Sequence, residues 1–294
     1  MDRLGTPART ASRQLAPPWP IELFDLAHPA VPASLDGLTI LHVTDVHVCK
    51  GRPTPLTVRR ALDAVRLTPA DLVVHTGDWM NYPGDEASAL RTLELFASAW
   101  RSRAGVFGTF GNHDSAEFRD RARRVPGITW LGAQLGAGTL VTSTQARLVP
   151  GLRLLGFDEP EDLLGELLAQ QVEPSTDQAT EPELTIALVH YPTEIYPAAD
   201  FGISILLAGH THGGQFRITR RFAPHTSCDL PHDMASGILR LRQTLCCVSR
   251  GVGNAIVDVR VNCQPQIPLY RLRRGILPPI GREEFNRLTQ QRAW

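Results

Sequence analysis

Residues 203–214 read Ile-Ser-Ile-Leu-Leu-Ala-Gly-His-Thr-His-Gly-Gly, and this stretch decides the interpretation of the fold. Its apolar first half is typical of a buried β-strand. Its second half places two histidines and a pair of glycines where that strand would end. Histidine is a common metal ligand, so the stretch predicts a strand that carries metal ligands at its tip.

Four more blocks of the sequence repeat this arrangement. Each follows a predicted strand, at 38–44, 71–76, 105–110 and 184–189, and the blocks are Asp45-Val46-His47, Gly77-Asp78, Gly111-Asn112-His113-Asp114 and His190. Because loops at strand ends carry functional side chains, five such blocks indicate one site along a sheet edge. Carboxylate, imidazole and amide ligands without a thiolate favour Mn, Fe, Zn, Ni or Mg over copper(I) or an iron–sulfur cluster.

The segments between these blocks predict alternating strands and helices. Apolar residues recur at helical spacing in two stripes, Val58-Ala61-Leu62-Val65 and Ala89-Leu93-Phe96-Trp100. We therefore expect two amphipathic crossover helices and βαβ units, with a first edge strand around 21–24. After Gly209 the pattern changes to short strand-like runs at 238–241, 244–248, 255–259 and 267–272, which predict a β-rich, antiparallel half.

The domain organisation is predicted from composition along the chain. Residues 1–18 are rich in Pro, Arg, Ser and Thr without periodicity, which is typical of a flexible leader. We expect residues 19–294 to form a single domain, with an exposed loop between 170 and 182.

Overall composition excludes several classes of protein. The chain has 294 residues, 43% of them hydrophobic, and its 30 basic and 30 acidic residues cancel, so no specific nucleic-acid partner is predicted. Its five cysteines are scattered and imply no disulfide framework, which favours a reducing, cytoplasmic location. No apolar run approaches the roughly 20 residues that span a bilayer. Peripheral membrane contact and the oligomeric state stay open.

The pairing of Gly-Asn-His-Asp at 111–114 with Gly-His-Thr-His-Gly-Gly at 209–214 resembles the calcineurin-like metallophosphoesterase superfamily over about residues 21–272. The resemblance implies an α/β fold of two facing mixed β-sheets flanked by helices, an αββα sandwich. It also implies two divalent metal ions as cofactors. Their ligands would be Asp45, His47 and His212 for the first ion, Asn112, His190 and His210 for the second, and Asp78 as the bridge.

The same resemblance implies a catalytic role for His113. A metal-bridging hydroxide would attack a phosphate ester in line, and His113 would act as the general acid beside the leaving group. Many members of the superfamily carry an acidic residue three positions after the bridging aspartate to steady this histidine, and here that position is Asn81. Its amide oxygen can still orient the ring, and Asp114 is a neighbouring alternative.

Two further stretches, 234–237 and 248–253, resemble the small bacterial phosphodiesterase branch of the superfamily. The preferred function is therefore that of a phosphodiesterase. A pyrophosphohydrolase of a lipid-linked nucleotide sugar is the first alternative, and Phe216, Phe222 and Met234 are its candidate apolar lining. A scaffold without catalysis on the same fold is the second alternative.

Several other residues have a structural and a functional interpretation. We expect His42 and His75 to be hydrogen-bonded core histidines, because the ligand set is complete without them. His225 and His232 fit a surface loop. Arg250 would either bind substrate phosphate or act as a structural donor within its turn.

Overall fold

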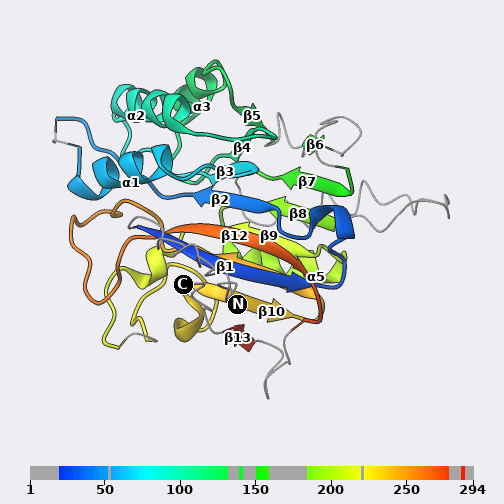
Figure 1. Cartoon of the computed structure of the whole chain (residues 1–294). Helices are drawn as coiled ribbons and strands as arrows, with labels where there is room; N and C mark the ends of the chain where they lie inside the picture. The colour runs from blue at the N-terminus through cyan, green and yellow to red at the C-terminus, as the bar shows by residue number, and fades with distance from the viewer. Residues whose placement is uncertain are drawn as a thin grey trace, which may run out of the picture.

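Two β-sheets face each other in the computed structural model, which describes residues 20–51, 54–131, 139–141, 150–158, 184–219, 222–277 and 286–288 (Figure 1). The first sheet has the order β1 (Ile21–His28), β12 (Ile267–Arg274), β2 (Thr39–Val43), β3 (Leu72–Thr76), β4 (Val106–Thr109) and β5 (Thr129–Trp130). The second has the order β13 (Asn286–Leu288), β10 (Gly237–Leu241), β11 (Thr244–Val248), β9 (Ile205–Ala208), β8 (Leu184–Leu188), β7 (Leu152–Gly156) and β6 (Thr139–Val141).

Helices cover the outer faces of both sheets. The α-helices are α1 (Leu56–Arg66), α2 (Glu86–Ala99), α3 (Ala116–Ala122) and α5 (Ile195–Asp200), and the 3-10 helices are η1 (Ala33–Leu35), η2 (Pro192–Glu194), η3 (His212–Gly214) and η4 (His232–Met234). The predicted fold class, two facing mixed sheets flanked by helices, is confirmed. None of the described helices is long and apolar enough to cross a bilayer.

Successive side chains along each strand point to opposite faces of its sheet, so the core has three layers: one between the two sheets and one on the outer face of each sheet. In β9, Ile205 and Leu207 face the opposite sheet, whereas Leu206 and Ala208 pack toward α5. The first sheet is divided in the same way, because Ile40 packs between the sheets and Leu41 toward the helices. Strands buried on both faces are continuous apolar runs, which is why the sequence predicted the strands before each ligand block to within about two residues.

The half of the chain after Gly209 differs from its prediction in two ways. Only part of the pairing is antiparallel, because β11 runs parallel to β9 and β12 runs parallel to β1. The run at 255–259 is an irregular segment instead of a strand. The predicted leader and the 170–182 loop lie outside the described residues, and the single domain stays a prediction.

Because two histidines are buried in the core, we expect the free energy of unfolding to decrease in acid. His42 and His75 are fully buried, and burial lowers the pKa of each ring to about 3. Because the unfolded chain binds protons near pH 6.5 and the folded chain does not, the free energy of unfolding decreases as the pH falls below about 6.5. Each ring contributes a slope of about 1.4 kcal/mol per pH unit in that range.

We therefore expect His75→Gln to flatten this slope by about 1.4 kcal/mol per pH unit. Urea unfolding between about pH 7 and pH 4, with a chelator present, measures the slope apart from any metal binding. The exposed His232 provides the matched variant, His232→Gln, which should keep the wild-type slope. Equal slopes in wild type and His75→Gln would show that His75 takes up its proton in the folded state.

Candidate metal centre

All five predicted ligand blocks lie at the carboxyl ends of neighbouring strands. Asp45 follows β2, Asp78 follows β3, Asn112 follows β4, His190 follows β8 and His210 follows β9. In a mainly parallel arrangement these ends gather at one edge, here the side to which the arrows of β2 and β7 point in Figure 1. The two sheets thus each contribute ligands to the same site.

The backbone of these ligands is held in an unfavourable conformation. Asp45, His47, Asp78, His210 and His212 all have positive φ angles, between 44° and 67°. A residue with a Cβ atom adopts this region at a cost of roughly 1–2 kcal/mol. Such strain gathers at sites where the side-chain positions matter for function.

Two glycines let the backbone approach the carboxylates closely. A Cβ atom on Gly209 would lie 2.3 Å from Asp45 Oδ2, and one on Gly111 would lie 2.3 Å from Asp78 Oδ1. Neither position can therefore carry a side chain without displacing a carboxylate. This close approach explains why glycine precedes the ligands in both blocks.

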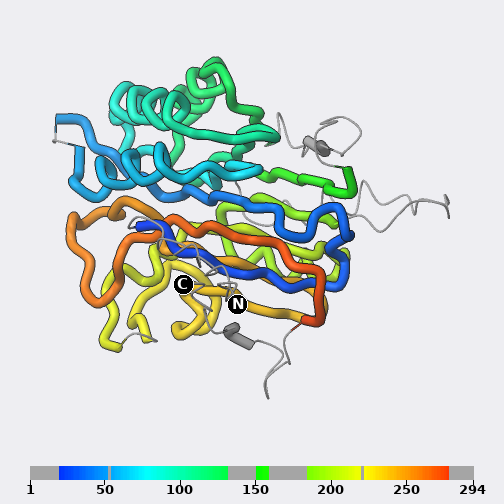
Figure 2. Tube along the Cα trace, in the orientation of Figure 1, coloured from blue at the N-terminus to red at the C-terminus, as the bar shows by residue number. Residues whose placement is uncertain are grey.

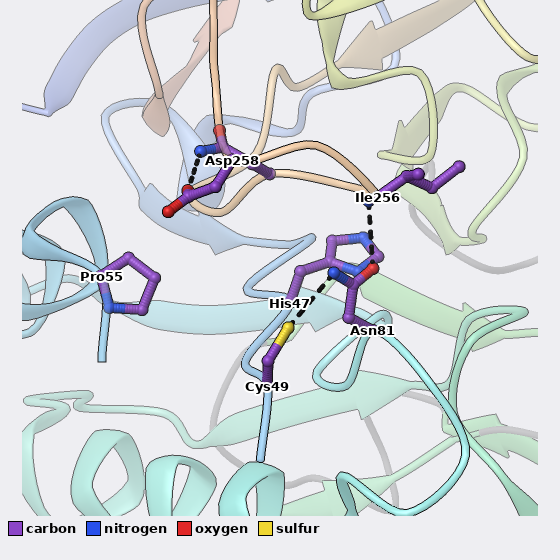
Figure 3. A pocket seen from close by; sticks show the side chains of 7 residues that line it. His47, Cys49, Pro55, Asn81, Ile256 and Asp258 are labelled. Carbon is purple, nitrogen blue, oxygen red and sulfur yellow. Dashed lines mark hydrogen bonds between the residues drawn. The ribbon is translucent and has the colours of Figure 1, made fainter. Parts of the chain in front are cut away.

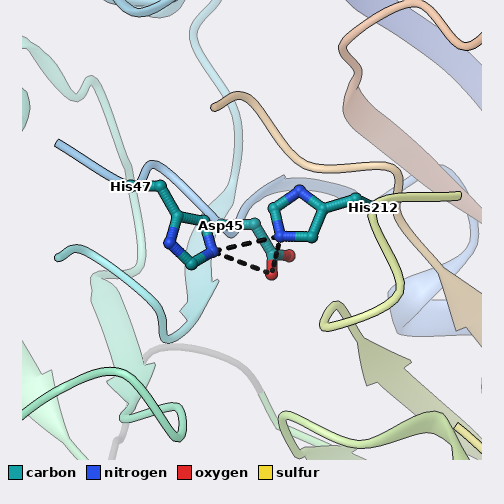
Figure 4. A group of neighbouring side chains, drawn as sticks. All are labelled: Asp45, His47 and His212. Carbon is teal, nitrogen blue, oxygen red and sulfur yellow. Dashed lines mark hydrogen bonds and ion pairs between the residues drawn. The ribbon is translucent and has the colours of Figure 1, made fainter. Parts of the chain in front are cut away.

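The first cluster consists of Asp45, His47 and His212 (Figure 4). Asp45 Oδ1 lies 3.9 Å from His47 Nε2 and 3.5 Å from His212 Nε2, and the two Nε2 atoms are 3.1 Å apart. All three side chains are buried. Two neighbouring ligands of one cation, each about 2.1 Å from it, have a similar separation.

The second cluster consists of Asp78, His190 and His210, with Asn112 beside it. His210 Nδ1 lies 3.2 Å from His190 Nε2 and 3.2 Å from Asn112 Oδ1. Its four donors are thus one carboxylate, two imidazoles and one amide oxygen. This set suits a hard or borderline divalent cation.

Asp78 connects the two clusters. Its Oδ2 atom lies 3.3 Å from His47 Nε2 and 3.2 Å from His190 Nε2. Its Oδ1 atom accepts a hydrogen bond from the backbone N–H of His113, which fixes the carboxylate. This is the position expected of a shared ligand.

Hydrogen bonds outside the clusters fix which ring nitrogens face inward. His190 Nδ1 donates to Thr76 O at 2.8 Å, and His210 Nε2 donates to Ser227 O at 2.8 Å. A bound cation would therefore meet the lone pairs of His190 Nε2 and His210 Nδ1. His47 Nδ1 has no hydrogen-bond partner among the described residues.

The charge distribution favours a positive centre in each cluster. Burial alone would lower the pKa of His47 and His190, but nearby carboxylates outweigh it and raise these pKa values to about 9 and about 10. Burial lowers the pKa of His210 to about 4 and that of His212 well below its usual value. Without metal, one protonated ring therefore provides the positive charge in each cluster, and divalent cations with the same ligands would replace these protons.

His113 lies beside the clusters, where its ring packs edge-on to His47 with centroids 4.9 Å apart. The expected support from the Asn81 side chain is absent, because His113 Nδ1 contacts the backbone oxygen of Asn81 at 2.7 Å. The amide of Asn81 points elsewhere: Nδ2 donates to Cys49 Sγ, and Oδ1 accepts from the N–H of Ile256 (Figure 3). A main-chain carbonyl thus takes the place of the acidic residue.

Asp114 does not contact the His113 ring through its carboxylate. Its two oxygens accept backbone N–H groups of Asp78, Trp79 and Gly111 at 2.8–3.0 Å. Burial, followed by the charge of Asp78, raises the pKa of Asp114 to about 6. The side chain therefore braces the loops that carry Asp78 and Asn112, which is a structural support.

Two arginines near the site have different surroundings. Arg250 pairs with Glu22 at 2.6 Å and donates to Gln264 O at 2.8 Å, which favours the structural interpretation of this residue over phosphate binding. Arg260 was missed by the sequence analysis. Its guanidinium donates to His212 O at 3.1 Å and to Arg250 O at 2.8 Å, and thereby ties the loops around the first cluster together. A lone arginine in a loop gave no signal of this role.

A two-sheet sandwich with a carboxylate and histidine centre at its strand ends defines a metallophosphoesterase. Residues 38–214 match the family model described as Calcineurin-like phosphoesterase, and the chain belongs to this family. The matched region includes the ligand blocks from Asp45 to His212. The predicted family is thus confirmed.

Several characterised and uncharacterised proteins are similar to the chain at low identity. The phosphodiesterase YaeI of Escherichia coli is 26% identical over 79% of this chain and 81% of its own length. The uncharacterized metallophosphoesterase YkuE of Bacillus subtilis is 22% identical over 83% of this chain and 82% of its own length. The UDP-2,3-diacylglucosamine pyrophosphatase LpxG of Chlamydia muridarum is 24% identical over 81% of this chain and 84% of its own length.

Proposed function

We propose that the chain is a phosphodiesterase that uses two divalent metal ions. The observation that carries this proposal is the position of Asp78 Oδ2, about equally distant from His47 and His190 of the two clusters. Asp45, His47 and His212 would hold one ion, Asn112, His190 and His210 the other, and Asp78 would contact both. When bound, two such ions supply a water-derived nucleophile near neutral pH and neutralise charge on the phosphoryl oxygens.

The protein's own contribution to the reaction is the placement of groups around the ester. His113 would hold the proton for the leaving oxygen, because its Nδ1 donates to Asn81 O and the imidazolium form of the ring would carry a second, transferable proton on Nε2. Asp114 would keep the loops of the site in register through its backbone hydrogen bonds. Burial of Asp45 and Asp78 limits competition from water for the same cations.

Hydrolysis of bis-p-nitrophenyl phosphate tests this proposal. Purified protein should release p-nitrophenol with Mn²⁺, Fe²⁺, Zn²⁺, Ni²⁺ or Mg²⁺ supplied singly, and a chelator should abolish the activity. A scaffold without catalysis would show no dependence on any of these ions. In that case elemental analysis would separate a metal-free protein from one that binds metal without turnover.

A pyrophosphohydrolase acting on a lipid-linked nucleotide sugar is the second candidate. The similarity to LpxG, named as a UDP-2,3-diacylglucosamine pyrophosphatase, supports it. Of the lining predicted for it, Phe216 and Phe222 are exposed whereas Met234 is buried. Comparing kcat/KM for a diester and for a diacylated nucleotide sugar under the same metal would decide between the two candidates.

A further inference from the structure

More than half of the large apolar side chains that the described residues expose lie in two loops and at Tyr82. The loops comprise residues 216–219 with Phe222, and residues 254–262; we call their exposed apolar side chains, with Tyr82, the apolar platform. Its eight members are 40–69% exposed: Tyr82, Phe216, Ile218, Phe222, Ile256, Val257, Val259 and Val261. Single exposed apolar residues are common, but a group of this size indicates a binding surface.

The two loops form one connected surface. Arg217 N donates to Val261 O at 2.9 Å, and Val261 N donates to Gln215 O at 3.0 Å. The Gln215 side chain adds hydrogen bonds to Val257 O at 2.8 Å and from Ala255 N at 3.0 Å. These bonds hold the backbone of the irregular segment in place while its apolar side chains point outward.

The apolar platform begins at the mouth of the metal centre. Ile256 N donates to the Asn81 side chain, and Tyr82 donates to Ile256 O at 3.3 Å. Figure 2 shows the segment 254–262 in orange on the same side of the molecule as the blue chain that follows β2. Whatever covers the apolar platform therefore also faces the centre.

The pocket between His47 and Ile256 is small, with a volume of about 30 Å³ (Figure 3). Of the apolar platform only Ile256 lines this opening, and the other side chains are exposed on the loops outside it, so they fit a broad apolar phase better than a single chain in a groove. The exposed Lys50 lies in the adjacent loop, and the sequence carries Arg220 and Arg221 between Ile218 and Phe222.

Exposed apolar side chains on loops whose sequence also carries basic residues are the chemistry of attachment to an anionic lipid surface. We propose that the apolar platform docks the protein onto a lipid bilayer, with the mouth of the metal centre facing the membrane. The attachment is peripheral and does not depend on the proposed hydrolysis.

Flotation with vesicles of phosphatidylcholine and phosphatidylglycerol tests the docking. The full chain should float with the vesicles, and the double variant Ile218→Ser/Val259→Ser should lose roughly tenfold or more in partitioning, because two apolar side chains no longer enter the lipid. The matched control Leu67→Ser/Leu95→Ser removes two exposed leucines outside the apolar platform and should float as the wild type does. Thermal unfolding of each variant reports whether the fold is kept.

The docking proposal would be overturned if the wild-type chain did not float with the vesicles, if the double variant floated as well as wild type, or if the control variant lost as much flotation as the double variant. It would also be overturned if light scattering showed that wild type is a dimer and the double variant a monomer while their flotation was the same. Diester hydrolysis in the absence of vesicles is measured separately. Failure of the docking proposal thus leaves the phosphodiesterase proposal intact, and the reverse also holds.

Discussion

Asp78→Asn is expected to remove both metal ions at once and to lower the rate of diester hydrolysis by roughly a thousandfold or more, about 4 kcal/mol of transition-state stabilisation. Asparagine keeps the shape of the side chain but loses the negative charge that faces His47 and His190. Its amide would also present a donor where Oδ2 or Oδ1 accepts. Elemental analysis of the purified variant gives the metal content, and bis-p-nitrophenyl phosphate gives the rate.

The exposed Asp233 offers the control for charge alone. Asp233→Asn should retain metal and activity, whereas His212→Ala should weaken mainly the first ion, because His212 contacts Asp45 and not Asp78 at salt-bridge distance. The metal-free protein can also be measured directly. Without the Asp78 charge, the pKa values of His47 and His190 should fall, which a histidine NMR titration detects. An undiminished pair of metals in Asp78→Asn would show that the bridging assignment is wrong.

The strands that carry the ligands were predictable because their signal is local. The run Leu72–Thr76 is buried on both faces and begins with three apolar residues, and a glycine follows it. The apolar run and the glycine are both visible in the sequence, whereas the close contact of Gly77 with Gly111 is not. The order of the strands is not visible in the same way, because β12 inserts between β1 and β2 from the far end of the sequence.

The segment 255–259 shows where an apolar pattern misleads. Ala-Ile-Val-Asp-Val has the composition of a strand, yet its backbone hydrogen bonds go to the side chains of Gln215, Asn81 and Tyr82 and to other residues of the same segment, instead of to a partner strand. Strand propensity measures how well side chains fit a pleated, half-buried surface, and it carries no information about whether a partner strand is present. The apolar side chains are exposed as a result, and this failure of prediction is the origin of the apolar platform.

At Asn81 the sequence analysis identified the residue that lies next to His113 but not the atom that contacts it. The sequence located the departure from the usual acidic residue, but the atom that meets His113 is the main-chain oxygen, which every residue possesses. The side chain is drawn away by Cys49 and Ile256, which lie 32 and 175 residues from it in sequence. Because these hydrogen-bond partners are distant in sequence, the residues around Asn81 do not indicate where its side chain points.

His113→Ala is expected to lower kcat by roughly a hundredfold to ten-thousandfold for a diester with an alkyl leaving group while metal content is unchanged. The reason is that an alkoxide needs a proton as it departs, and no second group that we assign to the site supplies one. With p-nitrophenolate, a much weaker base, the same variant should lose far less. The comparison of the two leaving groups therefore separates proton donation from a general disturbance of the site.

Asn81→Ala provides the matched variant for this test. If the backbone oxygen holds the His113 ring, removing the amide side chain leaves that hydrogen bond intact, and the variant should keep its dependence on the leaving group close to that of wild type. If the amide oxygen orients the ring, Asn81→Ala should reproduce the loss seen in His113→Ala for the alkyl ester alone. The two outcomes differ in kind, so the leaving-group comparison decides whether a main-chain carbonyl can replace the acidic residue as the support of a general acid.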